Sequence, residues 1–330
     1  MNFYASPAYL ALVSEAYFKG LPTSVEDVRI GQDVLRLLVV DKDRAITDVP
    51  FLDYHEPLAQ AEIRLPTRAH GYARWVTRGV IEPNEWEAHA RPGIEAAPYV
   101  DWSKASSFDG YMTLIKARSK GIIKDNERRR RRLADDLGEV TFCVDDARDD
   151  VFELARRWKR EQLVATGAND YLANPQNLEY LRLARERGIL LSSTLRAGGR
   201  LLSVWMGFIH DDVWSGWIFA YDHDPALRKY SLGHQLLRSM LEESFRRKHR
   251  EFDFSIGSED YKWIYSTHAR LLGPIGRPPL AQRVVVLAKQ QAKMALAAKP
   301  AWLELARSLR NKAASLPIVE RARPTQGEEP

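Results

Sequence analysis

The chain has 330 residues, of which 45% are hydrophobic, and a formal net charge of +5. Residues 278–330 hold nine Lys or Arg and four Asp or Glu, so this tail carries the whole excess and residues 1–277 are neutral. The composition therefore argues against a basic nucleic-acid-binding globule, and the length allows two domains. The single cysteine, Cys143, excludes an internal disulfide, and no apolar run is long enough to span a bilayer. We expect a soluble cytoplasmic protein.

The first 106 residues carry separate and mostly weak signals. The spacing of apolar residues predicts a helix or a strand in four places: a helix at 7–18, strands at 34–40 and 45–52, and a weak helix at 68–80. The second strand ends in four polar side chains, Asp53, Tyr54, His55 and Glu56. Such a cluster is either catalytic or a structural group where a strand meets a proline-bearing loop, and the structural interpretation is the more common one.

Two consecutive helices are expected at 108–118 and 121–137, and the second contains five arginines at 128–132. Consecutive helical positions point all around the axis, so one face cannot hold all five. A solvated, partly salt-bridged helix between two domains is the favoured interpretation. The alternative is a cationic edge that attracts a phosphorylated ligand.

From Gly138 the pattern becomes regular. The expected elements follow the order strand, two helices, three strands, helix, strand, with a last strand near the end: 139–144, 149–166, 175–187, 189–195, 201–210, 213–221, 234–250, 252–256 and 269–275. Asn174 is the expected N-cap of the second of these helices. The chain contains no Gly-rich dinucleotide fingerprint, no phosphate-binding loop with GK[ST] and no Cys/His metal spacing. We therefore expect no metal.

The segment 213–262 carries the most concentrated polar signal. Its first strand ends at Tyr221 and Asp222, and the loop that follows brings Arg228, Lys229, Ser231 and Gly233 to the start of a helix. A glycine there permits a tight turn, and the free N–H groups of a helix start favour an anion. The alternative is an ordinary strand-to-helix turn with a solvated basic pair.

These residues also carry a resemblance. The pattern is Tyr-Asp, then Tyr-Ser-x-Gly before a helix, then Phe-Asp-Phe-x-x-Gly and Tyr-Lys, present here as Tyr221-Asp222, Tyr230-Ser231-Leu232-Gly233, Phe252-Asp253-Phe254, Gly257 and Tyr261-Lys262. It resembles the GNAT (general-control-related N-acetyltransferase) superfamily, in the branch of the cellulose-biosynthesis-associated acetyltransferases, which is distantly similar to the Fem-type aminoacyltransferases.

The resemblance implies a mixed α+β fold, with a mostly antiparallel central sheet flanked by helices. It extends from about residue 107 to 275, which gives an acyltransferase domain at 107–277. In this branch the first half is often a degenerate copy of the same fold, and residues 1–106 permit that organisation. Residues 278–316 are expected to form basic amphipathic helices, and residues 317–330 a disordered tail.

The resemblance further implies acyl-CoA as co-substrate. Its expected binding residues lie on the strand, the loop and the helix start of segment 213–262: Phe219, Tyr221, Arg228, Lys229, Ser231, Gly233, His234 and Lys262. Typical members place Gln/Arg-x-x-Gly-x-Gly/Ala on the pyrophosphate loop, whereas this chain has one glycine, Gly233. Arg228 and Lys229 would compensate by charge, because a phosphate needs donors and positive potential more than one motif.

Acyl transfer to an amine needs a group that takes the amine proton and a group that protonates the leaving thiolate. Asp253 lies between Phe252 and Phe254 on a strand, so its side chain points away from both, and it is either the base or a structural acceptor. Asp222, His223 and Glu259 are competing bases. Tyr261 is a candidate acid for the thiolate, although a packed turn is the more common role for it and for Lys262.

We expect an acyl-CoA-dependent N-acyltransferase that acts on an amine of an envelope-type molecule, either an amino sugar or a lipid amine such as a sphingoid base. Two alternatives stay open: a Fem-like aminoacyltransferase that uses aminoacyl-tRNA, the one case in which nucleic acid would be a partner, and a non-catalytic module that binds a glycan or a partner. Basic residues interleave with apolar ones at 278–312, which favours contact with an anionic membrane surface, at the inner face of the membrane.

Overall fold

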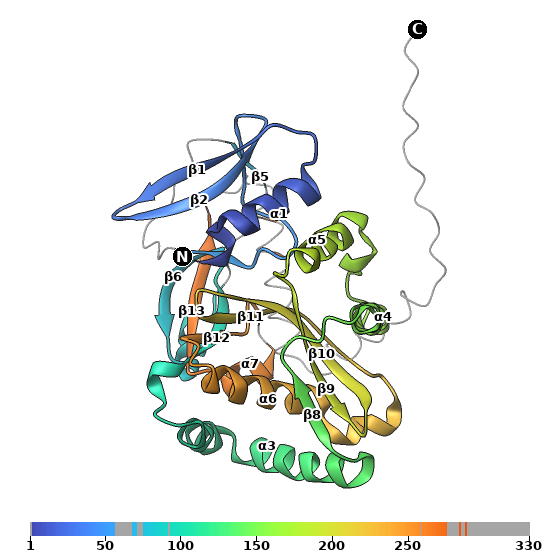
Figure 1. Cartoon of the computed structure of the whole chain (residues 1–330). Coiled ribbons are helices and arrows are strands. Elements are labelled where there is room, and N and C mark those ends of the chain that lie inside the picture. The colour runs from blue at the N-terminus through green and yellow to red at the C-terminus, as the bar shows by residue number, and fades with distance from the viewer. Residues whose placement is uncertain are drawn as a thin grey trace.

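The computed structural model describes residues 2–56, 68–70, 75–91, 93–257, 259–275, 284 and 288 (Figure 1). Its strands form two sheets, a four-stranded sheet in the order β1-β2-β3-β5 and a nine-stranded sheet in the order β4-β6-β13-β7-β12-β11-β10-β9-β8. The predicted tail helices at 278–316 and the predicted disorder at 317–330 lie outside the described residues. In the described part of the chain, no helix is both long and apolar enough to cross a membrane.

The strands are β1 (Thr23–Ile30), β2 (Asp33–Val40), β3 (Arg44–Ile46), β4 (Tyr54–His55), β5 (Arg68–His70), β6 (Trp75–Ile81), β7 (Glu95–Asp101), β8 (Val140–Cys143), β9 (Leu191–Ala197), β10 (Arg200–His210), β11 (Val213–Tyr221), β12 (Glu251–Asp253) and β13 (His268–Pro274). The α-helices are α1 (Pro7–Tyr17), α2 (Trp86–His89), α3 (Phe108–Leu137), α4 (Asp149–Ala165), α5 (Pro175–Glu186), α6 (Leu232–Arg246) and α7 (Asp260–Tyr265). Short 3-10 helices include η1 (Phe3–Ala5), η4 (Tyr171–Ala173) and η5 (Pro225–Tyr230).

The second half of the chain follows the predicted order of elements, and the mixed α+β fold is confirmed. Asn174 caps α5, because its side chain accepts a hydrogen bond from the N–H of Gln176. The two helices expected around residues 119–121 form one long helix, α3, with non-helical backbone angles at Ser119. The predicted joint is therefore a kink.

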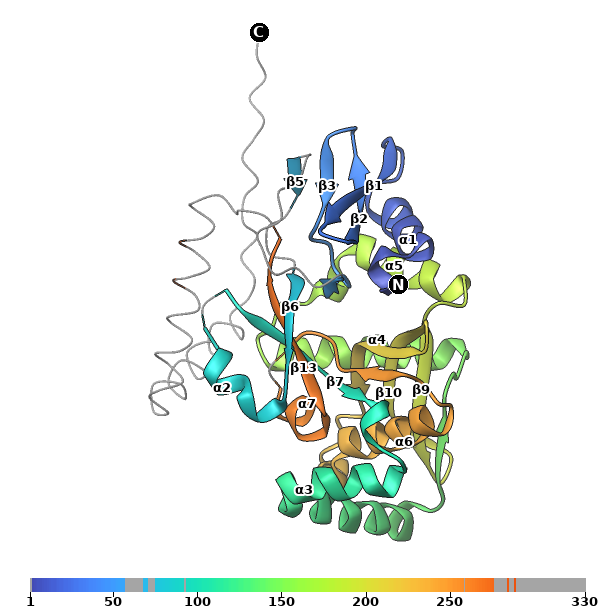
Figure 2. The same ribbon diagram turned by 90° about the vertical axis from the view of Figure 1, so that its left-hand side faces the viewer.

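The nine-stranded sheet draws on both halves of the sequence. Strand β7 lies between β12 and β13, antiparallel to both, and β6 is antiparallel to β13. Figure 2 shows β6, β7 and β13 side by side. Strands from both sides of residue 106 are hydrogen-bonded in this one sheet. A domain boundary at residue 106 therefore stays a prediction from the sequence.

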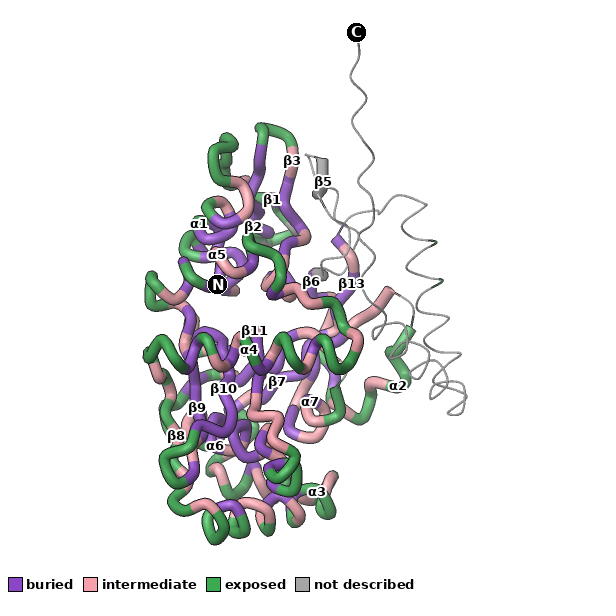
Figure 3. Tube along the Cα trace, turned by 90° about the vertical axis from the view of Figure 1, so that its right-hand side faces the viewer, coloured by how far each residue is buried: buried purple, intermediate pink, exposed green. Residues whose placement is uncertain are grey.

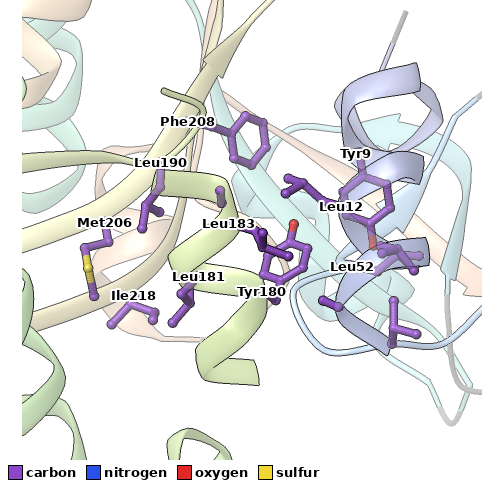
Figure 4. Close-up of a cluster of buried hydrophobic side chains, with 14 of the residues drawn as sticks. Tyr9, Leu12, Leu52, Tyr180, Leu181, Leu183, Leu190, Met206, Phe208 and Ile218 are labelled. Carbon is purple, nitrogen blue, oxygen red and sulfur yellow. The ribbon is translucent and has the colours of Figure 1, made fainter. Parts of the chain in front are cut away.

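Helices cover the central strands on both faces. Helices α3 and α6 pack on one face through a core that includes Trp214, Phe252 and Phe254. Helices α4, α5 and α1 lie on the other face, above β10 and β11 (Figure 3). Figure 4 shows Tyr180 and Leu181 of α5 between the sheet residues Met206, Phe208 and Ile218 and the α1 residues Tyr9 and Leu12.

Two expectations for the first half were wrong or incomplete. The weak helix expected at 68–80 is wrong, because 68–70 and 75–81 are strands β5 and β6. Strands β1 and β7 were not predicted. Strand β7 is buried at its five central residues, so its sequence EAAPYVD shows no polar alternation to reveal it.

Candidate active site

Strands β11 and β12 separate in the middle of the large sheet. They pair in parallel over three positions, the last of which joins Ser215 to Asp253. Strand β12 then ends, whereas β11 continues to Tyr221. Opposite β10 the register of β11 jumps from Gly216 to Ile218, so Trp217 is one extra residue, a β-bulge. A bulge leaves the extra residue out of the ladder and bends its strand. We call the start of this separation, at Gly216 and Trp217, the divergence point.

A tryptophan packs directly against the divergence point. A Cβ atom added to Gly216 would lie 1.9 Å from Nε1 of Trp205. Only glycine therefore allows the indole of Trp205 to lie across the backbone of β11 at this position. The bulge and the glycine together fix where β11 leaves β12.

The chain after β12 is tied to the same point. Ser255 has a left-handed backbone (φ 60°), and its hydroxyl donates to the carbonyl oxygen of Gly216 at 2.8 Å. The ammonium of Lys262, which is only 5% exposed, donates to the carbonyl oxygen of Ile256 at 2.8 Å and pairs with Glu259 at 3.2 Å. In this structure the donors of Lys262 are therefore directed at the main chain after β12.

Asp253 is buried on the face of β12 opposite its phenylalanine neighbours, as the alternation predicts. Its carboxylate accepts hydrogen bonds from the Tyr54 hydroxyl at 2.6 Å and from the N–H of Ser255 at 2.8 Å. Burial raises the pKa of Asp253, although the charge of Arg270 and these two hydrogen bonds oppose the increase. A carboxyl whose pKa moves toward neutrality is better matched to proton transfer at neutral pH.

The polar cluster noted at residues 53–56 joins this site. The Tyr4 hydroxyl donates to Asp53 at 2.7 Å, and the indole N–H of Trp217 donates to the same hydroxyl at 3.4 Å. Tyr54 reaches Asp253 across 199 positions of sequence. Local sequence patterns carry no signal for that contact, so sequence reasoning did not connect the two.

A buried arginine organises the neighbouring strands. Arg270 of β13 pairs with Glu251 of β12 and, at 3.2 Å, with Glu56. Its guanidinium lies 4.0 Å from the ring centre of Tyr99 and 5.6 Å from that of Tyr54. The positive charge therefore lies among two carboxylates and two aromatic faces, which compensates part of its desolvation.

The start of α6 differs from the expected turn. Ser231, not Gly233, adopts the left-handed conformation (φ 53°), so the tight turn occurs two residues earlier than predicted. A Cβ atom on Gly233 would lie 3.0 Å from the ring of Phe219, so this glycine allows a close contact with β11. The N–H groups of His234 and Gln235 donate to the Ser231 carbonyl. The N–H groups of Leu232 and Gly233 come earlier in the helix and have no carbonyl acceptor within it.

The basic residues of the loop lie on the surface, but they are not equivalent. Arg228 and Lys229 are both exposed, and Lys229 pairs with Asp136 of α3 at 2.8 Å. Hydrogen bonds from Lys229 and Tyr230 lower the pKa of Asp136 to about 2. Arg129 donates to the Lys229 carbonyl at 2.9 Å. These contacts attach the loop to α3.

The five-arginine run is partly salt-bridged, as the favoured interpretation expected. Arg128 and Arg129 both pair with Asp125, and Arg132 lies 3.5 Å from Asp136. His234 lies nearby, with its Nδ1 3.3 Å from the Tyr265 hydroxyl. Burial, and secondarily Arg129, lower the pKa of His234.

Three other predicted catalytic residues and the predicted cofactor-binding residue Tyr221 have partners other than Asp253. Asp222 pairs with Arg200 at 2.8 Å, and Nε2 of His223 lies 2.8 Å from the carbonyl oxygen of Trp158, to which it must donate. Tyr261 packs edge-on against Phe254, and burial raises its pKa. Tyr221 is half-buried and lies against the rings of Phe219 and His223.

Comparisons with known proteins bear on the class of this domain. Residues 123–263 match the family model described as an acetyltransferase (GNAT) domain. The GNAT resemblance is therefore confirmed over these residues, and the domain belongs to the acyltransferase class. A search of curated proteins found no match.

Several solved structures are similar to most of the chain. FemX has 10% identity and a TM-score of 0.47, over 83% of this chain and 91% of that one. The C-terminal domain of a putative lysylphosphatidylglycerol synthetase from Agrobacterium fabrum has 11% identity and a TM-score of 0.42, over 86% and 95%. A tandem GNAT protein from the clavulanic acid biosynthesis pathway has 13% identity and a TM-score of 0.34, over 82% and 95%.

Proposed function

We propose that the protein is an acyl-CoA-dependent N-acyltransferase whose reaction takes place at the divergence point. The observation that carries this proposal is the bulge at Trp217, where β11 leaves β12 and runs on to the uncapped start of α6. A donor with a long thioester arm and a phosphorylated end fits a strand of this kind, because backbone N–H groups are presented at both of its ends.

The phosphates would lie at the start of α6. The N–H groups of Leu232 and Gly233 are directed out of the helix end, and the helix dipole favours an anion there. Arg228 adds positive charge on the exposed loop, whereas Lys229 is held by Asp136. The ring of Phe219 lies against Gly233 and would contact the arm of the donor.

At the other end of the strand, the thioester carbonyl would accept hydrogen bonds from the bulged backbone around Trp217. The acceptor ammonium first gives up one proton, which we assign to Asp253. The neutral nitrogen then attacks the carbonyl carbon and forms the new C–N bond. The C–S bond breaks, and the second proton that leaves the nitrogen goes to the thiolate. Tyr54 donates to the Asp253 carboxylate and orients it.

The acceptor would be an amine of an envelope-type molecule, either an amino sugar or a lipid amine. The basic apolar segment 278–312 would bring the protein to an anionic membrane surface from the cytoplasmic side. No group of His, Cys, Asp or Glu in the described part of the chain is arranged to hold a metal ion.

Thermal stability with coenzyme A, acetyl-CoA and palmitoyl-CoA tests the donor. A ligand that binds the native state raises the melting temperature by mass action. We expect all three to raise it, palmitoyl-CoA most if the acceptor is a lipid amine, and Arg228→Glu to reduce each shift. Arg157→Glu is the matched control, since Arg157 lies on α4 with a side chain 63% exposed. If none of the three ligands raises the melting temperature of the folded protein, acyl-CoA is not the donor.

Exposed arginines on α3 favour a second candidate, an aminoacyltransferase that uses aminoacyl-tRNA. The Arg128 side chain is 74% exposed and that of Arg132 is 59% exposed, so both are accessible to a phosphate backbone. This candidate predicts tRNA binding that weakens steeply with salt, and Arg128→Glu should weaken it further. A non-catalytic binding module would instead show no turnover at all.

A further inference from the structure

One carboxylate of the site lies among aromatic rings. Asp53 is half-buried and accepts from the Tyr4 hydroxyl, which in turn accepts from the indole of Trp217. The ring of Phe51 is 5.8 Å from that of Trp217 and 5.8 Å from that of Tyr171. The negative charge of Asp53 contributes to the raised pKa of Tyr171, after burial and Asp170. We call Phe51, Tyr171 and Trp217 the aromatic wall.

The aromatic wall lies at the edge of the core, where its three residues pack against the buried cluster. The three residues of the wall are half-buried, whereas Tyr180, which stacks on Phe51 at 5.2 Å, is fully buried. Phe51 has φ +62°, a conformation that costs a bulky residue free energy and is often kept where a function requires it. The buried Tyr180 hydroxyl has no hydrogen-bond partner among the described residues. One polar group behind the wall therefore has no partner in the described part of the chain.

The carboxylate of Asp53 also has no ion-pair partner among the described residues. Arg270 pairs with Glu56 and Glu251, and in the part of the chain that the structure describes no Lys or Arg pairs with Asp53. A half-buried carboxylate that is linked to a cluster of half-buried aromatic residues attracts a cation by its charge, and the ring quadrupoles add to that attraction. An ammonium group fits both.

We propose that Asp53 and the aromatic wall bind the acceptor amine as an ammonium ion attached to an apolar carrier. This inference rests on the proposed function, because it identifies the ammonium as that of the acceptor. Two hydrogen bonds link Asp53 through Tyr4 to Trp217, so the bound nitrogen lies next to the bulge that would hold the thioester. An apolar carrier packs against aromatic rings without losing hydrogen bonds. An amino sugar would lose them there, because each of its buried hydroxyls needs a hydrogen-bond partner.

Isothermal titration of the full chain without acyl-CoA tests the site, with n-hexylammonium, 1-hexanol and glucosamine as probes. We expect n-hexylammonium to bind about tenfold or more tightly than 1-hexanol, which has the same chain without the charge. Asp53→Asn should remove that preference, because the amide keeps the shape and loses the charge. Asp43→Asn, at an exposed position on the preceding turn, should leave it unchanged.

Equal binding of n-hexylammonium and 1-hexanol to the unaltered chain would overturn the proposal, and this comparison needs no variant to fold. Tighter binding of glucosamine than of n-hexylammonium would also overturn it, as would an unchanged preference in folded Asp53→Asn. The failure of the donor proposal gives a different result. Stabilisation by palmitoyl-CoA without an ammonium preference contradicts only the present inference, whereas an ammonium preference without any acyl-CoA shift supports the cation site and contradicts only the donor.

Discussion

The two faces of β12 differ in what holds them in place. Toward α6, Phe252 and Phe254 are at most 1% exposed and pack with Trp214. On the opposite face Asp253 is also buried but bonds Tyr54 and Ser255. Burying each phenylalanine stabilises the fold by about 1.5–3 kcal/mol, whereas buried charges lose most of their attraction to desolvation.

This difference separates stability from chemistry within one short strand. The apolar face fixes the position of β12, and therefore where β11 leaves it. The polar face holds a carboxylate in a defined hydrogen-bonded geometry at that point. Variants on the two faces should consequently separate into those that change unfolding and those that change turnover.

The largest effect on stability is expected from Phe254→Ala on the apolar face. The ring is 1% exposed and lies against Phe252 and Tyr261, so its removal leaves a cavity that costs about 3–5 kcal/mol. Urea unfolding followed by circular dichroism measures this loss. A loss smaller than that of Val80→Ala, at a half-exposed position of β6, would contradict the assigned role of the apolar face.

A smaller loss, about 1–3 kcal/mol, is expected from Gly216→Ala. The added methyl would meet the indole of Trp205 at 1.9–2.5 Å, so the indole or β11 must move. Gly79→Ala is the matched control, because Gly79 also lies in a strand of the large sheet and has no atom within 4 Å of the added Cβ. Equal urea midpoints for the two variants would show that the indole does not fix the divergence point.

How much of this could be read from sequence depends on how local each signal is. The order of elements from β8 to β13 follows from periodicity and turn residues, and the opposite directions of Asp253 and its neighbours follow from strand geometry. Strand β7 was missed because it is buried and therefore lacks alternation. Tyr54 reaches Asp253 although β6, β13 and β7 lie between β4 and β12 in the sheet order, and no local rule encodes a contact between residues 199 positions apart.

The smallest effect on stability, and the most informative, is expected from Asp253→Asn on the polar face. Burial raises the pKa of Asp253 above its ordinary value of 3.8, so the folded state holds this proton more tightly than the unfolded chain. The stability that this group contributes is therefore fully present below about pH 4 and is lost as pH rises through the folded pKa. The loss is about 1.4 kcal/mol for each pH unit that separates the folded from the unfolded pKa. Asparagine has no such proton.

Relative to the unaltered chain, the variant should consequently lose more free energy of unfolding at pH 4.5 than at pH 7. Urea unfolding at both pH values measures this difference. Asp43→Asn, at an exposed position, should show no such trend. If Asp253 takes the amine proton, the same variant loses about 10²-fold or more in acyl transfer while its stabilisation by acyl-CoA is retained. Retained turnover together with the pH trend would assign Asp253 to holding Tyr54 and the start of the segment after β12, and would leave the proton to another group at the divergence point.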